Sequence, residues 1–239
     1  MCRCDNNVRL RKIQLWFLIK RRSATLSVRY IFDRNKYNYG VKKFIDKSAN
    51  KKKNLVFCII GALFTLVLGS LSHFFFEWSG NETVVGILFA ANESVWEHLK
   101  LIIFLTLVWF AVGLPFMRKT NNYAFAAFVS TAIGMIVIPC VFYAYTSFTG
   151  ESILAVDIAT FVVAVLAGYA AAFWVMCLKE SDFLFSVAIA GLIAIIAAYL
   201  TLTLYAPQKI LFLDPVSGGY GIPAVSYTHL RAHETLANL

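Results

Sequence analysis

The sequence predicts an all-α protein that crosses a membrane about five times as a bundle of helices. Hydrophobic residues make up 59% of the chain and charged residues only 15%, whereas charged residues make up about 25% of an ordinary soluble domain. Five apolar runs are long enough to cross the hydrocarbon core of a bilayer, which takes roughly 20 residues each. The basic residues between these runs alternate as membrane topology requires.

The positive charge of the chain is concentrated at its beginning. Sixteen of the 22 lysines and arginines lie in residues 1–53, together with only three aspartates. Residues 54–224 hold five basic and nine acidic residues, so the membrane part is acidic. The net charge of +9 is therefore a property of a basic N-terminal arm, and we expect a lipid bilayer, and no nucleic acid, as partner.

The arm is expected to be disordered and to contain no membrane span. Its one apolar stretch, residues 13–19, is far shorter than a span, and the arm shows no helical or strand period. From Val41 onward the sequence resembles a short bacterial N-terminus, and an internal GTG start codon is translated as valine. We therefore expect residues 1–40 to be translated upstream DNA.

The end of the chain resembles a translated sequencing-library adaptor. Every codon of that adaptor accounts for one residue of the run VSYTHLRAHET, residues 225–235. Residues 225–239 are expected to be an artefact of this kind. The pair His229 and His233, whose spacing otherwise invites a metal interpretation, is therefore set aside.

The spans are expected in the order Leu55–Phe76, Leu99–Met117, Tyr123–Phe148, Ile153–Leu178 and Phe183–Tyr205. Together they form a predicted membrane domain over residues 54–206. Val84–Ala91 is apolar but too short to cross, so it is predicted to be an interfacial or re-entrant piece. Residues 207–224 are rich in proline and glycine and are predicted to form an extracytoplasmic segment with tight turns that folds back over the polar residues of His73–Lys100.

The basic residues beside the spans predict the orientation. Lys51–Lys53, Arg118–Lys119 and Lys179 are separated by one pair of spans each, and the positive-inside rule places all of them in the cytoplasm. The protein is thus predicted to lie in a bacterial plasma membrane, with the N-terminus inside and the C-terminus outside.

This topology brings the exceptional polar residues to a similar depth near the outer membrane face. Charge at that depth is costly unless it is used or paired, so the cluster is the candidate site. The candidate catalytic residues are His73, Glu77, Glu93, Glu97, His98 and Asp157, with Lys100 beside them.

One interpretation of the cluster is a divalent metal site. Its candidate ligands are His73, Glu77, Glu93 and Glu97, a mixed set that suits zinc, manganese or iron, and Asp157 is a candidate fifth member. Glu93 and Glu97 also repel each other at helical spacing unless a proton or cation lies between them. The chain contains no HExxH pattern.

A structural interpretation competes with the metal site and is the favoured one. Asn92 is a good helix N-cap, and carboxylates stabilise the first turn of a helix. Glu97 can pair with Lys100, and Trp78 and Trp96 are typical of an aromatic belt at a membrane interface.

Three functions stay open at this point. The first is an intramembrane metal- or carboxylate-dependent enzyme that acts on a lipid or envelope substrate. The second is an ion- or proton-coupled transporter component that uses Asp157 and the glutamates, although no inverted repeat is visible. The third is a structural subunit without chemistry.

Four motifs carry a resemblance to a known family: GSLSHFFFEWSG, AANESVWEHLKL, PCVFYAYTS and DPVSGGYG. They are similar to a bacterial family of small multi-spanning membrane proteins of unknown function, over about residues 54–222. Similar proteins often show Pro-Val where this chain has Ala90–Ala91. The resemblance implies the fold and the membrane location, and it implies no activity.

Overall fold

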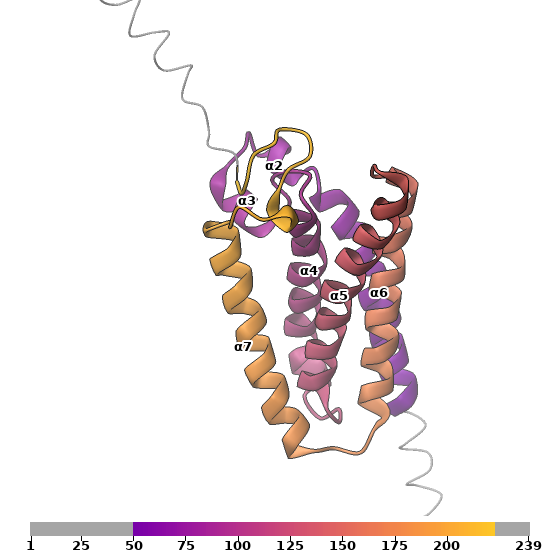
Figure 1. The fold of residues 1–239 in the computed structure, drawn as a ribbon. Helices are drawn as coiled ribbons and strands as arrows, with labels where there is room; N and C mark the ends of the chain where they lie inside the picture. The colour runs from indigo at the N-terminus through magenta and orange to yellow at the C-terminus, as the bar shows by residue number, and fades with distance from the viewer. Residues whose placement is uncertain (1–49, 223–239) are drawn as a thin grey trace, which may run out of the picture. The chain divides into compact units, whose positions relative to one another are not determined.

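The computed structural model describes residues 50–222, and it confirms the predicted all-α class. The predictions for residues 1–49 and 223–239 lie outside this described part. Within it, five helices are long and apolar enough to cross a membrane: Asn50–Ser72, α4 (Val95–Met117), α5 (Tyr123–Thr149), α6 (Leu154–Cys177) and α7 (Asp182–Leu204) (Figure 1). Two short helices, α2 (Phe75–Trp78) and α3 (Thr83–Leu88), precede α4, and the 3-10 helix η1 (Ile210–Phe212) follows α7.

The α5 helix lies at the centre of the packing, because it contacts α4, α6 and α7. It approaches α6 closely at Gly168, where an added Cβ atom would lie 2.8 Å from the backbone oxygen of Ser130. The first helix packs against α6 through a hydrogen bond of 2.9 Å between the hydroxyls of Thr65 and Tyr169. Gly168 lets the backbones of α5 and α6 approach closely, as small residues do in other membrane bundles.

Large apolar side chains cover the outside of the long helices. Leu63, Val163 and Ile193, for example, are each more than half exposed. The α7 helix has the smallest buried share of the five, and Figure 1 shows it standing apart from the others along much of its length. Such a surface is stable in hydrocarbon and is costly in water.

Three predicted spans agree with the structure to within one residue at each end, but the first two differ. The first helix is predicted from Leu55 to Phe76, and the observed helix runs from Asn50 to Ser72. The second is predicted to begin at Leu99, and α4 begins four residues earlier, at Val95. At these helix ends polar residues adjoin the apolar run. Hydrogen bonds and caps decide where such a helix ends, and hydrophobicity alone does not report them.

The predicted short apolar segment does not cross the bundle. Within it α3 forms a helix of six residues. The hydroxyl of Tyr199 on α7 donates to the carbonyls of Ile87 and Leu88, at 3.0 and 2.8 Å. These bonds satisfy carbonyls at the end of α3 that have no partner within their own helix.

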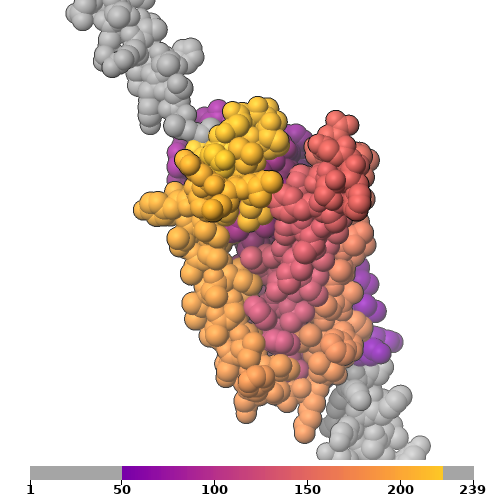
Figure 2. Space-filling view, viewed as in Figure 1, coloured from indigo at the N-terminus to yellow at the C-terminus, as the bar shows by residue number. Residues whose placement is uncertain are grey.

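The C-terminal segment, residues 207–222, folds back as predicted. Figure 2 shows this segment, in yellow, over the end of the bundle that carries α2 and α3. Asn92 Nδ2 donates to the carbonyl of Gly221 at 2.8 Å, which ties the segment to the loop before α4.

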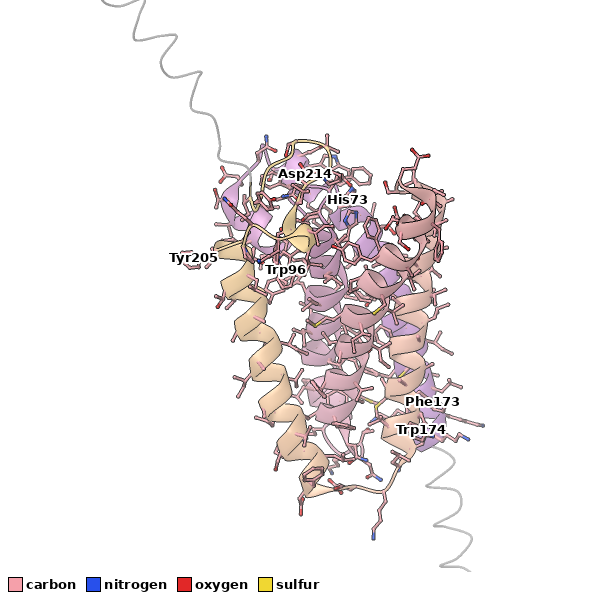
Figure 3. The ribbon with its side chains drawn as sticks, in the orientation of Figure 1. His73, Trp96, Phe173, Trp174, Tyr205 and Asp214 are labelled. Carbon is pink, nitrogen blue, oxygen red and sulfur yellow. The ribbon has the colours of Figure 1, made fainter. Side chains whose placement is uncertain are left out.

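The predicted cytoplasmic residues gather at the opposite end. Lys53 Nζ donates to the carbonyl of Phe116 at 2.8 Å, and Asn122 Nδ2 donates to the carbonyl of Lys179 at 3.0 Å. In Figure 3, His73 lies at the other end of the bundle, far from Trp174 at the end of α6. The arrangement agrees with strict alternation of the spans.

Candidate metal centre

The end of the first helix sets the position of His73. Ser70 Oγ donates to the carbonyl of Leu66, and Ser72 Oγ donates to the carbonyl of Gly69, both at 2.9 Å. Such bonds compete with the helical hydrogen bonds and favour a helix end. The chain turns at His73, so the prediction that the first span continues through His73 to Phe76 is wrong.

Glu77 is consequently separated from His73 by the turn. It lies in α2, and its side chain is exposed to solvent. Its charge still helps to raise the pKa of His73, but as the smallest of several causes. Glu77 is therefore a neighbour of the candidate site and not one of the residues whose ligand atoms gather there.

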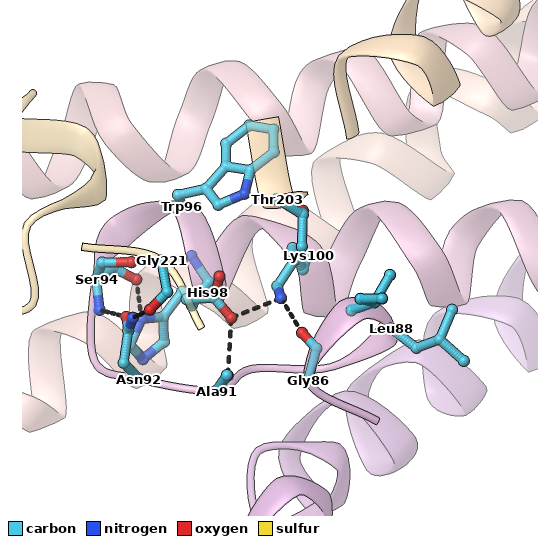
Figure 4. Close-up of polar contacts among 12 residues, drawn as sticks. Gly86, Leu88, Ala91, Asn92, Ser94, Trp96, His98, Lys100, Thr203 and Gly221 are labelled. Atoms are coloured by element: carbon cyan, nitrogen blue, oxygen red, sulfur yellow. Dashed lines mark hydrogen bonds and ion pairs between the residues drawn. The ribbon is translucent and has the colours of Figure 1, made fainter. Parts of the chain in front are cut away.

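The start of α4 sets the position of Glu93. Ser94 is the N-cap, because its hydroxyl accepts a hydrogen bond from the backbone N–H of Glu97. The prediction that Asn92 caps this helix is wrong by two residues. Asn92 Oδ1 instead accepts from the backbone N–H of Ser94 at 2.8 Å, which closes an Asx turn before the helix (Figure 4). Glu93 lies inside this turn and outside the helix.

Three side chains meet at this point, and we call them the His–Glu–His cluster: His73, Glu93 and His98. His73 Nε2 lies 3.2 Å from Glu93 Oε1, and His98 Nε2 lies 3.6 Å from Glu93 Oε2. One ligand atom of each residue lies within 4.8 Å of those of the other two. Their side chains are 28%, 48% and 38% exposed, so the cluster is accessible without being fully solvated.

One hydrogen bond of the His98 ring shows which of its two nitrogens carries the proton in the neutral form. Nδ1 lies 2.9 Å from the carbonyl oxygen of Ser94, which can only accept. In the neutral ring Nδ1 therefore carries the proton, and Nε2 keeps its lone pair. A backbone carbonyl on the far nitrogen is the arrangement that commonly orients a metal-binding histidine.

Glu93 and His73 shift each other's pKa. The hydrogen bond to Glu93 raises the pKa of His73 above the usual histidine value, although partial burial opposes the shift. The same contact lowers the pKa of Glu93, while partial burial and the charge of Asp214 oppose it. Each of these two groups therefore favours the charged form of the other.

Glu97 does not join the cluster. Its Oε2 lies 2.6 Å from Lys100 Nζ and accepts from the backbone N–H of Ala91 at 2.7 Å. Lys100 also donates to the carbonyl of Gly86 in α3 (Figure 4). Both charged side chains are almost completely buried. The predicted pair of Glu97 and Lys100 is confirmed, and it connects α4 to α3.

The cluster lies in the wall of a cavity of about 650 Å³. Asp157 on α6 lines the same cavity, and Tyr145 donates a hydrogen bond of 2.5 Å to its carboxylate. Apolar side chains from α4, α5 and α6, with Phe74 just after the first helix, form most of the remaining wall. The cavity wall thus contains the candidates His73, Glu93, His98 and Asp157, whereas Glu77 and Glu97 do not line it.

The C-terminal segment contributes the last part of the wall through Pro215 and Val216. Asp214 shapes this loop by accepting from the backbone N–H groups of Val216 and Ser217, at 3.1 and 3.2 Å. These bonds, with the hydroxyl of Ser217, lower the pKa of Asp214, although its burial opposes the shift.

Sequence reasoning placed His98 among the catalytic candidates but left it out of the metal ligands. It treated Glu93 as part of the helix, where position 98 would point away from position 93. The serine at position 94, three residues before a glutamate, is a capping-box pattern, and it was the signal that Glu93 precedes the helix.

Comparison with known proteins identifies a family and no activity. A family model described as a family of unknown function, DUF6512, matches residues 44–222, close to the range of the resemblance in the sequence. Comparisons with curated proteins and with solved structures find no match. Because the match covers most of the chain, the protein belongs to this family of unknown function, DUF6512.

Proposed function

We propose that this protein is a metal-dependent membrane enzyme that binds one divalent ion, with zinc as the best fit, through His73, Glu93 and His98. The observation that carries the proposal is the convergence of three ligand atoms within 4.8 Å in the wall of a largely apolar cavity. Two histidines and one carboxylate form the ligand set of several zinc hydrolases, in which substrate or water takes the fourth position.

A metal ion accounts for the position of all three residues when His98 is neutral. His73 and Glu93 form an ion pair at 3.2 Å. When the His98 ring is neutral, the carbonyl of Ser94 holds its proton at Nδ1, and the lone pair at Nε2 lies 3.6 Å from a carboxylate oxygen of Glu93. Two electron pairs that face each other repel unless a proton or a cation lies between them. A metal ion satisfies Nε2 and the carboxylate together.

The chemistry that fits this site is hydrolysis of an acyl ester or amide. A bound divalent ion lowers the pKa of its water and polarises a carbonyl group. The water oxygen then bonds to the acyl carbon, the ester or amide bond breaks, and the leaving group takes up a proton, without any redox change. Asp157 lines the same cavity, and a carboxylate in that position supports proton transfer to or from the reacting groups.

We further propose that the site faces the outside of a bacterial plasma membrane. The basic residues at the opposite end of the bundle support this orientation through the positive-inside rule. Five helices that are apolar enough to span a membrane support the location in a bilayer.

The proposal predicts about one zinc per chain after zinc loading and dialysis, measured by inductively coupled plasma mass spectrometry. The protein is purified through a tag without histidine, so that the tag binds no metal. We expect His73→Ala, His98→Ala and Glu93→Gln each to lower the zinc affinity at least tenfold, because each removes a ligand.

The matched control is Glu82→Gln, which removes an exposed carboxylate from the same end of the bundle. This variant is expected to keep the full zinc content. Wild-type protein that retains no zinc, or ligand variants that bind zinc as the wild type does, would contradict the proposal.

A further inference from the structure

We propose that the cavity binds the hydrocarbon chain of an outer-leaflet amphiphile, which enters sideways from the membrane between the first helix and α6. The acyl carbonyl of this amphiphile then lies at the His–Glu–His cluster. This inference rests on the proposed function for the position of the carbonyl, and it adds the class of substrate and its route.

The walls of the cavity match a hydrocarbon chain. Its volume of about 650 Å³ is within the usual range of ligand pockets, about 300–1,000 Å³. Leu101, Ile138, Phe142 and Phe161 form apolar wall from three different helices, and the polar cluster lies where the first helix and α4 meet the loops. A ligand with one apolar and one polar part satisfies both regions.

The first helix and α6 are separated at the rim but touch each other farther along, toward the middle of the bundle. This contact closes the cavity at that end. At Gly69 an added Cβ atom would lie 2.6 Å from the ring of Phe161, so the two helices touch there. Farther along the same pair of helices, Thr65 and Tyr169 are hydrogen-bonded. A chain that enters the cavity therefore cannot continue between these two helices toward the opposite end.

The rim between the end of the first helix and the start of α6 is formed by exposed apolar side chains. Phe74 follows the first helix, and Leu154 and Ile158 lie in the first turns of α6. All three line the cavity, and they are also 46%, 74% and 56% exposed at the surface. On the side away from the membrane, Pro215 and Val216 of the C-terminal segment add apolar wall. An apolar rim beside a span favours entry from lipid over entry from water.

The charges in the wall favour a neutral polar group. Glu93 and Asp157 are the acidic residues of the wall, and no lysine or arginine lines the cavity in the described part of the chain. An anionic group would meet these carboxylates without a basic partner, whereas an ester or amide carbonyl needs only a polarising cation. The geometry points to the carbonyl end of an acyl chain, with the charged headgroup directed toward solvent.

The test uses proteoliposomes of phosphatidylcholine that contain a phosphatidylcholine with a diazirine on one acyl chain. After illumination, labelled residues are identified by peptide mass spectrometry. Leu101 and Ile138 are only 5% and 7% exposed but line the cavity, so bulk lipid cannot reach them. We expect label on both residues, and none on Val165, which is also buried, at 1% exposed, but lies outside the cavity wall.

A pair of matched substitutions isolates the route. Ile158→Trp enlarges a side chain at the rim, and Ile193→Trp makes the same change on the lipid-facing surface of α7. Both side chains are more than half exposed, so neither change disturbs the core. Ile158→Trp is expected to lower the label on Leu101 and Ile138 at least fivefold, while Ile193→Trp leaves it unchanged.

Zinc content is measured in the same samples, which separates the two proposals. Bound zinc without label on Leu101 and Ile138 overturns this inference and leaves the proposed function standing. Label that is equal in the two tryptophan variants overturns the lateral route. Label on both buried residues without bound zinc contradicts the proposed function and supports the cavity as a lipid-chain site.

Discussion

Glu97 and Lys100 are the most deeply buried charges in the described part of the chain, with side-chain exposures of 1% and 0%. The pair also connects two backbone segments, because Glu97 accepts from Ala91 and Lys100 donates to Gly86. Removing one partner of a buried pair leaves an uncompensated charge, which is far more costly than removing both. These residues therefore hold α3 against α4, and the chemistry is assigned to their neighbours.

This role predicts that Lys100→Met lowers the free energy of unfolding by about 3–5 kcal/mol, because the Glu97 carboxylate loses its buried partner. The double change Lys100→Met with Glu97→Gln should be less destabilising than the single change. Reversible unfolding in mixed micelles measures both. The control Lys209→Met removes an exposed lysine and should change little. Equal stability of the Lys100 and Lys209 variants would show that the pair does not hold the fold.

Single residues also show where sequence reasoning about the site reached its limit. Spacing predicted the pair of Glu97 and Lys100, because three-residue separation on a helix brings side chains together. It did not predict that His98 meets His73, because that contact depends on a turn that begins at the first histidine and on the cap at Ser94. Both are local hydrogen-bond choices that hydrophobic periodicity does not report.

At the scale of helices, the apolar runs alone predicted five spans, since length and hydrophobicity decide which segments can cross a bilayer. The ends were predicted well for α5, α6 and α7, whose flanks are short polar loops. They were predicted less well for the first helix and α4, where serine hydroxyls compete for backbone carbonyls or cap the helix. The site lies at these two ends, so its geometry was the part of the fold least accessible from the sequence.

For the short helices, too, the sequence predicted one property and tertiary contacts decide another. The sequence predicted that Val84–Ala91 does not cross the membrane, because it is too short. Its position depends on tertiary contacts, namely the bonds from Tyr199 to two carbonyls of α3 and from Lys100 to Gly86. Such long-range partners leave no periodic signal in the chain.

For the whole molecule, the arrangement of the two ends predicts a definite topology. In single-cysteine variants made on a cysteine-free background, Lys119→Cys and Lys179→Cys should be protected from an impermeant thiol reagent in intact cells. Glu82→Cys and Glu151→Cys, at the end that carries the site, should react. All four positions are exposed in the structure, so protection reports the membrane and not burial. Reaction at Lys179→Cys with protection at Glu151→Cys would mean the opposite orientation.

X-ray absorption at the zinc edge reports whether His73, Glu93 and His98 bind one metal ion together. Zinc-loaded wild-type protein should show two imidazole ligands at roughly 2.0–2.1 Å and a remaining shell of oxygen. His98→Ala should retain a single imidazole ligand. A spectrum without imidazole in the wild type, or one that is the same in the wild type and in His98→Ala, would contradict the account.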